Sequence, residues 1–528
     1  MSNHIKMVIK RLTKNDTAAL KGFAILCIIL HNFFHWMAPF PGENEFLFNP
    51  ACVQNFFRLL GEQPQEFINI IFSYLGHYGV QIFILLSGYG LAVSMFRHEK
   101  DWTTFIVDRL KKLYPLLLTG IIAFILFQIV SEHKFLSSLD WIEVSHKLLF
   151  VHTLIPNSGT SLNGPWWFFG LIFQLYLLFP LLFRFIRKHD WKAFAAICVI
   201  CYTVIFLFRD VFDLYHGEIV MMNAPGHLPE FCLGILLAQN QRRKIHPAWL
   251  IPAVAVFCLG NYFSAFYPFT FLAISLVVLF AYQGLKALPH KKGRLAKTMI
   301  YFGEISMVLF AIHGFFRRAF LDMATTAGGF WEHVLVFVLF FITVWCVSLG
   351  AKQLYEFLVR LFGHIKIKES KASHIVSSVF QIAFGLLFAY IIGYYIFLNV
   401  NVFDKELENF ETLSDEVTVK DDLQYIDMAN VKFDKTYKSI TINGSFDMMS
   451  TDTTTKLPTI VIAINGLLWD KFVIPENLNT SEYNKYEFSY QYNCPFYKTL
   501  KGKKLKLYFW NTGKNSMEAK NIQVSVKY

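Results

Sequence analysis

Charged residues are scarce in this sequence. Lysine, arginine, aspartate and glutamate make up 16% of its 528 residues, whereas hydrophobic residues make up 55%. Soluble domains average about 25% charged and about 45–50% apolar residues, so this composition excludes an ordinary soluble protein. Apolar stretches of about 20 residues recur between Ala18 and Val400, and each is long enough to cross a bilayer core as a helix. We therefore predict an all-α polytopic membrane bundle of ten or eleven spans.

Cysteine spacings typical of metal sites are also lacking. Most of the eight cysteines fall inside apolar stretches, whereas Cys52 and Cys494 could both lie outside the membrane, which leaves a disulfide open. The net charge of +11 would suggest nucleic acid as the partner of a soluble protein. Here the basic residues fall in short loops between apolar stretches, as they do in membrane proteins. We expect no metal and no nucleic-acid partner.

The spacing of the apolar stretches predicts eleven spans. The first could be a cleaved signal peptide, but it lacks a small-residue cleavage site, so we interpret it as a retained span. The predicted centres lie near Ile28, Phe83, Ile122, Phe173, Val199, Gly234, Val256, Leu276, Val308, Phe341 and Leu386. If these spans alternate, six basic clusters all fall on one side, which the positive-inside rule makes cytoplasmic. We expect a multi-pass protein of the cell membrane with its N-terminus inside and its C-terminus outside.

The composition changes after about residue 400. Residues 1–375 contain the main bundle, 376–401 an additional transmembrane helix, and 402–424 a polar, acidic linker. Residues 425–528 alternate between apolar and polar positions and contain Asn-Gly turns, which is typical of antiparallel strands. We predict an extracytoplasmic, sandwich-like β domain there. Two interpretations remain open for four of its aromatic residues, which could stack on sugar rings or fill the core: Trp469, Tyr508, Phe509 and Trp510.

The first span carries unexpected polar residues. His31 and His35 are four residues apart and therefore share a helix face, in the outer half of the span. Lys21 lies about 15 Å nearer the cytoplasm, at 1.5 Å per residue. Ionisable groups inside a span are costly and default to functional candidates. A neutral histidine can act as a general base, although both could instead be polar residues that anchor the helix end.

Other polar residues interrupt later spans. Glu230 lies near the outer start of one span, where its carboxylate could pair with a histidine or lysine or orient a base. His313 lies deep in another span. Trp166 opens a span at the outer interface, as residues of an aromatic belt do, and Gln174 is buried further along the same span.

Several segments, in this order, resemble the acyltransferase-3 family of bacterial membrane proteins, which acylate cell-surface sugars and similar acceptors. The resemblance covers residues 14–360. Span one matches the family's opening, a basic residue followed by a histidine, here Lys21 and His31. The remaining matching segments are "GVQIFILLSGYGLAVSM", "FIVDRLKKLYPLL", "NGPWWFFGLIFQLYLLFPLL", "HLPEFCLGILL" and "GEISMVLFAIHG".

The chain also departs from the family's pattern. Members usually place the catalytic histidine eleven residues after the basic residue, where this chain has Asn32, one residue beyond His31. Either His31 takes over the role or the site is altered. The basic residue is Lys21 rather than the commoner arginine, which loses bidentate phosphate contact but keeps a point charge. An eleventh span and the outer β domain are additions to the usual ten-span body.

The resemblance implies an O-acyltransferase that moves an acyl group, expected to be acetyl, from cytoplasmic acyl-CoA to a hydroxyl of an extracytoplasmic glycan of the cell envelope. Acyl-CoA would be a donor substrate, with no cofactor bound permanently. His31 would act as base or acyl relay, with Glu230 or His313 orienting it or stabilising charge. The residues expected at the donor are Lys21, Arg109, Lys111, Lys112 and Tyr114. Those expected at the surface or lipid-linked glycan acceptor are His35, Trp166 and Gln174.

Two alternatives belong to other functional classes. Several spans with polar residues inside them also suit a non-catalytic exporter or flippase of glycan-linked lipid, but the sequence shows no internal repeat of the kind found in many transporters. A surface-anchored glycan-binding protein would use the β domain, yet eleven spans exceed what anchoring requires. The acceptor, the acyl group and the oligomeric state stay open.

Overall fold

The structure is a computed structural model with two compact units, which are described separately. Before the C-terminal part it describes residues 12–37, 39, 42–131, 140–155, 158–213, 218–239, 247–287, 293–326 and 329–363. In the C-terminal part it describes residues 411–412, 416–419, 425–434, 437, 439–451, 457–465, 467–472, 479, 482–494, 500–511 and 516–528.

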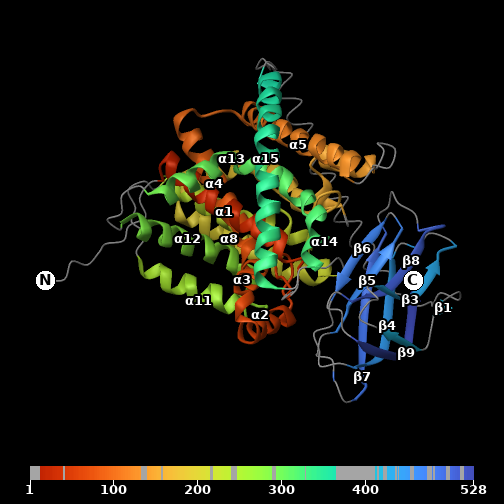
Figure 1. The fold of residues 1–528 in the computed structure, drawn as a ribbon. Coiled ribbons are helices and arrows are strands. Elements are labelled where there is room, and N and C mark those ends of the chain that lie inside the picture. The colour runs from red at the N-terminus through yellow and green to blue at the C-terminus, as the bar shows by residue number, and fades with distance from the viewer. Residues whose placement is uncertain are drawn as a thin grey trace. The chain divides into compact units, whose positions relative to one another are not determined.

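Helices form the first unit (Figure 1). The ten that contain predicted span centres are α1 (Lys14–Phe34), α4 (Gly79–Arg97), α5 (Trp102–Ser131), α7 (Trp167–His189), α8 (Trp191–Asp213), α10 (Ala224–Gln239), α11 (Leu250–Gly260), α12 (Thr270–Ala287), α13 (Arg294–Phe316) and α15 (Phe330–Gly363). Shorter helices join them, namely α2 (Pro50–Glu62), α3 (Phe67–Leu75), α6 (Trp141–Leu148), α9 (Glu218–Met221) and α14 (Arg318–Thr326).

Seven helical stretches among the described residues are long and apolar enough to cross a membrane. They are Lys14–Phe34, Pro64–Arg97, Trp102–Ser131, Gly164–His189, Tyr267–Lys286, Arg294–Phe316 and Phe330–Gly363. The helices α8 and α11 contain shorter apolar segments. The predicted polytopic helical bundle is therefore confirmed. The eleventh predicted centre, Leu386, lies outside the described residues.

The helix α1 carries the candidate histidines, and its position is set at its start and along its length. Thr13 caps the helix, because its hydroxyl accepts from the backbone N–H of Asp16 while the Asp16 carboxylate accepts from the N–H of Thr13. Glycines bring α1 and α13 into backbone contact. A Cβ added at Gly303 would lie 1.8 Å from the carbonyl oxygen of Ala18. Such small-residue contacts are typical of membrane helix packing.

The second unit is a β-sandwich of antiparallel strands, which confirms the predicted β domain (Figure 1). One sheet has the order β1-β3-β8-β5-β6 and the other β2-β9-β4-β7. The strands are β1 (Glu411–Thr412), β2 (Glu416–Val419), β3 (Tyr425–Lys432), β4 (Ser439–Ser450), β5 (Thr459–Ile464), β6 (Leu468–Phe472), β7 (Asn484–Asn493), β8 (Lys504–Trp510) and β9 (Met517–Lys527). Because β1 and β2 pair with β3 and β9, the sheets include part of the segment that we predicted as a linker.

The alternation along β8 decides between the two interpretations of the aromatic residues. Phe509 is buried and contacts Phe446 of the opposite sheet, with ring centroids 4.9 Å apart. Tyr508 and Trp510 alternate with Phe509, so they lie on the outward face, where they are half-buried. Trp469 of β6 is exposed. Phe509 therefore belongs to the core and the other three residues do not.

Candidate functional site

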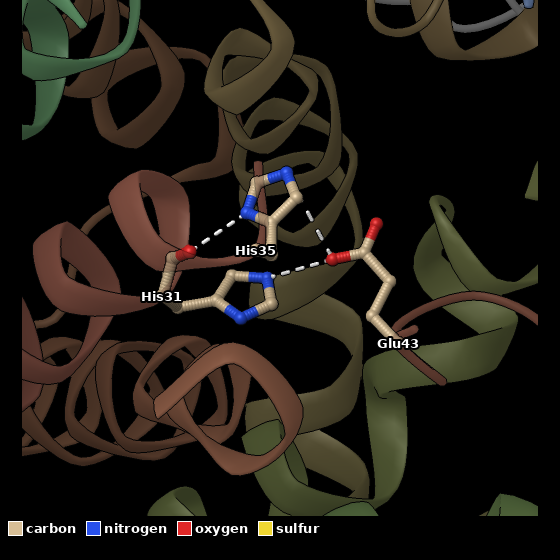
Figure 2. Close-up of side chains that lie close together, drawn as sticks. All are labelled: His31, His35 and Glu43. Atoms are coloured by element: carbon tan, nitrogen blue, oxygen red, sulfur yellow. Dashed lines mark hydrogen bonds and ion pairs between the residues drawn. The ribbon is translucent and has the colours of Figure 1, made fainter. Parts of the chain in front are cut away.

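The last turn of α1 brings the two predicted histidines together. The rings of His31 and His35 are stacked, with centroids 4.7 Å apart and planes 23° from parallel. Only 2% of His31 and 7% of His35 is exposed. Figure 2 shows both rings beside Glu43, a residue of the loop that follows the helix. The four-residue spacing thus predicted their shared face correctly.

Backbone carbonyls orient both imidazoles. The Nδ1 atom of His31 lies 3.2 Å from the carbonyl oxygen of Phe72, and that of His35 lies 2.7 Å from the carbonyl oxygen of His31. Because each Nδ1–H donates to a carbonyl, each ring keeps Nε2 for other chemistry. Both Nε2 atoms face Glu43, and burial holds the pKa of His35 well below its ordinary value.

Two carboxylates complete this group. Oε2 of Glu43 lies 3.1 Å from Nε2 of His31 and 4.0 Å from Nε2 of His35 (Figure 2). Oε2 of Glu45 lies 3.9 Å from Nε2 of His31. The contact between His31 and Glu43 is an ion pair without hydrogen-bond alignment, so among the described residues Nε2 has no hydrogen-bond partner. This nitrogen is therefore available to a substrate.

The environment separates the pKa values of the two carboxyl groups. Burial by itself would raise the pKa of Glu43, but the adjacent rings of His35 and His31 outweigh it and hold the pKa below its usual range. Burial raises the pKa of Glu45, and the Glu43 carboxylate adds to the rise against the opposing effect of His31. Paired titratable groups with separated pKa values are typical of acid–base sites.

The loop that carries both carboxylates is held in place by hydrogen bonds. The hydroxyl of Tyr267 donates to the carbonyl oxygens of Asn44 and Glu45, at 2.6 and 2.7 Å. The side-chain oxygen of Asn44 accepts from the backbone N–H of Asn49, and its NH₂ group donates to the hydroxyl of Tyr74. Glu43 and Glu45 were not among the residues predicted from the sequence. Two acidic residues in a short loop directly after span one, in a chain with little charge, are the sequence signal that could have found them.

A third histidine packs against the pair. His77 is buried, and its ring meets that of His31 edge-on, with centroids 5.4 Å apart. Neither of its ring nitrogens has a hydrogen-bond partner among the described residues. The neighbouring Gly76 makes room for His31, because a Cβ there would lie 2.7 Å from the Cβ of His31. His77 was also absent from the residues predicted from the sequence.

The same group of atoms could hold a metal ion. One ligand atom from each of His31, His35 and Glu43 lies within 4.8 Å of the others. Imidazole nitrogens and carboxylate oxygens are ligands that Zn²⁺ accepts, and the imidazole N–H groups already donate to carbonyls as in many zinc sites. The same atoms can equally share a proton, which is what acid–base catalysis needs.

Asn32 has a different partner. The guanidinium of Arg317 donates to the backbone and side-chain oxygens of Asn32, at 3.0 and 3.4 Å, and lies over the ring of Trp36. Asn32 itself donates to the carbonyl oxygen of Ile28. The residue that stands at the family's usual histidine position therefore anchors Arg317, and His31 is the residue that faces the carboxylates.

The structure pairs Glu230 with another histidine. Its Oε1 lies 2.8 Å from Nδ1 of His227, three residues earlier, and both side chains are buried. The ring of His227 stacks between those of Trp167 and Phe271. The expected carboxylate–histidine pair therefore exists, although His227 is its partner and not His31.

The other predicted residues are distributed over the bundle. His313 is buried, its Nδ1 lies near two carbonyls of its own helix, and its Nε2 has no hydrogen-bond partner among the described residues. The indole of Trp166 donates to the carbonyl of Ala311. Gln174 bonds to Thr153, Asn223 and the backbone of Ala224. The polar groups of Trp166 and Gln174 thus bind the protein itself, and their assignment to the acceptor stays a prediction.

Residues predicted to bind the donor lie on α1 and α5. Lys21, Arg109 and Lys111 are half-buried and Lys112 is exposed, and none of the four forms an ion pair within the part of the chain that the structure describes. The Nε of Arg109 is buried without a hydrogen-bond partner there. The hydroxyl of Tyr114 donates to the carbonyl oxygen of Leu148. Unneutralised cations at one end of α5 suit an anionic ligand.

Comparison with known proteins agrees with this helical part of the chain. The acyltransferase-3 family, described as an acyltransferase domain, matches residues 18–352. The chain is also similar to acyltransferase MdmB of Streptomyces mycarofaciens, with 36% identity over 117 residues. That alignment covers 22% of this chain and 30% of the relative, so the chain spans less than a third of that protein's length. No solved structure shows a significant match.

Proposed function

We propose a specific reaction for this chain, which belongs to the acyltransferase-3 family and is therefore a membrane acyltransferase. It transfers an acyl group, acetyl in the simplest case, from acyl-CoA on the cytoplasmic side to a hydroxyl group of an extracytoplasmic glycan. The positive-inside rule supports this orientation, with the N-terminus inside and the β domain outside the cell membrane.

One observation supports the proposal above all others, namely the position of His31 beside Glu43. The Nε2 atom of His31 is oriented, buried and without a hydrogen-bond partner among the described residues, and a carboxylate lies 3.1 Å away. A histidine that gains a proton next to a carboxylate becomes an imidazolium, which that carboxylate stabilises. Nε2 of His31 and Oε2 of Glu43 are both buried, whereas 32% of the Glu43 side chain as a whole is exposed, so the acceptor hydroxyl enters this group from the side of the loop.

The proton then follows a short route. The acceptor hydroxyl gives its proton to Nε2 of His31 while its oxygen attacks the carbonyl carbon of the thioester. The carbon–sulfur bond breaks, and the leaving CoA thiolate takes the proton from Nε2. The products are the O-acyl glycan and CoA with a free thiol. A route in which His31 first carries the acyl group needs room for an acyl carbon bonded to Nε2, beside Oε2 of Glu43 at 3.1 Å, so we favour His31 as base.

The cations of α1 and α5 suit the other substrate. CoA carries phosphates, and Arg109, Lys111 and Lys112 lie at the end of α5 that we assign to the cytoplasm. Lys21 lies on α1 between that end and His31, at a depth that the pantetheine arm must pass. The donor therefore reaches His31 from the cytoplasmic side, and the acceptor reaches it from the side of the outer loop.

The test replaces His31 with alanine in the full chain and measures acylation of the surface glycan together with release of CoA thiol. Loss of a general base lowers such rates by about 10²–10⁴-fold. Asn32→Ala is the matched control, since it alters the neighbouring position without removing the proposed base. Wild-type acylation by a correctly inserted His31→Ala protein would remove His31 as the base. Export of glycan-linked lipid without any thioester cleavage would instead favour a transporter.

A further inference from the structure

The outward face of the five-stranded sheet carries an aromatic cluster that the acyl-transfer reaction does not use. Of the described residues of the β domain, Tyr425 and Trp469 are the large hydrophobic side chains with the greatest exposure, at 55% and 49%. Both lie on this face together with Tyr508 and Trp510. Figure 1 shows their strands, β3, β8 and β6, in the same sheet, with β5 between β8 and β6.

The rings of this cluster contact one another, and two of the pairs meet edge-on, Tyr425 with Tyr508 at 75° and Trp469 with Trp510 at 67°. Tyr425 and Trp510 form a cross-strand pair whose ring planes are 17° from parallel, with centroids 6.2 Å apart. The indole N–H of Trp469 donates to the hydroxyl of Tyr508 at 3.1 Å. Beneath them Val461 is fully buried. Lys471 of β6 lies on the same face, with its Nζ 5.4 Å from the ring centroid of Trp510. The cluster therefore presents aromatic rings and polar edges beside a cation.

Lysines continue the same face along the same strands. Lys504, Lys506, Tyr508 and Trp510 alternate along β8, so they form one stripe about 20 Å long. Lys432 of β3 lies directly opposite Lys504 in the sheet. Like charges in a direct cross-strand pair are destabilising. Within the described residues none of these three lysines has an acidic partner, so the pair is left for an external anion to neutralise.

We propose that this face binds an acidic glycan chain, with sugar rings stacked on the aromatic cluster and acidic groups paired with the lysines. The face of a pyranose ring presents C–H groups, which suit the negative face of an aromatic ring, and its hydroxyls suit polar edges. Asp427, opposite Tyr508, accepts hydrogen bonds from sugar hydroxyls. The inference depends on the proposed function in one respect, namely that the β domain lies outside the membrane, where the glycan acceptor is.

Binding is measured on the full-length protein in nanodiscs without any acyl donor, so this test and the acyl-transfer test fail independently. The probes are polygalacturonate, which carries carboxylates, a lipid-free teichoic acid, which carries phosphates, and neutral dextran. We expect binding to at least one acidic probe, little binding to dextran, and weakening with increasing salt. Failure to bind either acidic probe overturns the proposal.

Two double variants separate the parts of the face. Tyr425→Ala with Trp469→Ala removes exposed stacking rings, and we expect binding to weaken at least about fivefold, the lower end of what loss of a stacking ring costs. Lys432→Gln with Lys504→Gln weakens binding and flattens its salt dependence. Because Lys432 and Lys504 repel each other, this second variant folds at least as well as the wild type.

A matched control uses the other sheet, where Lys520 lies over the ring of Tyr483. Tyr483→Ala with Lys520→Gln removes one ring and one positive charge there and leaves binding unchanged in our proposal. Equal losses in the control and in the aromatic variant overturn it. So does loss of acidic-probe binding when phosphatidylglycerol replaces phosphatidylcholine in the nanodisc, because the lysines then lie on lipid.

Discussion

Replacing Glu43 with glutamine removes the charge beside His31 and keeps a side chain of nearly the same size. The ion pair joins Nε2 of His31 and Oε2 of Glu43 at 3.1 Å. For two unit charges at that distance, an effective dielectric constant of about 20 gives about 5 kcal/mol. Since 32% of the Glu43 side chain is exposed, solvent screening reduces this to about 2–3 kcal/mol. The proposed mechanism starts from a neutral His31 ring, so this energy belongs to the transition state.

We therefore expect the Glu43→Gln variant to lose about 30–150-fold in kcat, with little change in KM for the donor. The assay follows CoA thiol release by the full-length protein at saturating acyl-CoA and acceptor. Glu45→Gln is the matched control in the same loop. Its carboxylate lies 3.9 Å from Nε2 and its pKa is raised, so it contributes less charge, and we expect a loss below about tenfold. A Glu45→Gln loss equal to or larger than that of Glu43→Gln would refute the reasoning.

Three further predictions concern stability and pH. Gly303→Ala should destabilise the detergent-solubilised protein by about 1–3 kcal/mol, because its Cβ would meet the Ala18 carbonyl, whereas Gly90→Ala, which has open space, should not lower the thermal midpoint. His227→Leu should cost about 3–5 kcal/mol by leaving the buried Glu230 unpaired, and adding Glu230→Gln should restore part of this loss in the same unfolding assay. The pKa of Glu43 lies below its ordinary value of 4.5, so its stabilising effect is complete above that pH and disappears as the pH falls through the folded-state pKa. The stability difference between the wild type and Glu43→Gln should therefore be present at pH 5 and close as the pH falls below 4.5, and a difference that does not close there would contradict it.

The helical part of the fold was predictable because its signal is long and strong. An apolar stretch of about 20 residues has few structural choices in a bilayer, since every backbone group must be hydrogen-bonded within it. Ten predicted span centres lie in helices for this reason. The start of the β domain was harder to predict, because β1 and β2 are short and lie in a segment whose acidic composition is typical of a linker.

The sequence predicted only those parts of the candidate site whose residues lie close together in one helix. His31 and His35 share a face through the helical period, which the spacing contains. Glu43 comes from a loop, and its direction depends on hydrogen bonds from Tyr267, more than 200 residues away, to the loop backbone. The partner of Glu230 was within reach of sequence reasoning, since His227 lies one helical turn earlier. That pair was missed because the expected partner was sought in span one.

By itself, the sequence determined the class of protein, the helical bundle, the β domain and the shared face of the two histidines. All of these follow from composition and from periods of about two or about 3.6 residues, which act over a single element. The tertiary structure alone decided that Glu43 and Glu45 meet His31, that Asn32 binds Arg317, and that the aromatic residues of β8 divide between core and surface. Contacts between distant segments depend on the packing of whole helices and strands. The spacing of apolar and polar residues along a single helix or strand therefore does not predict them.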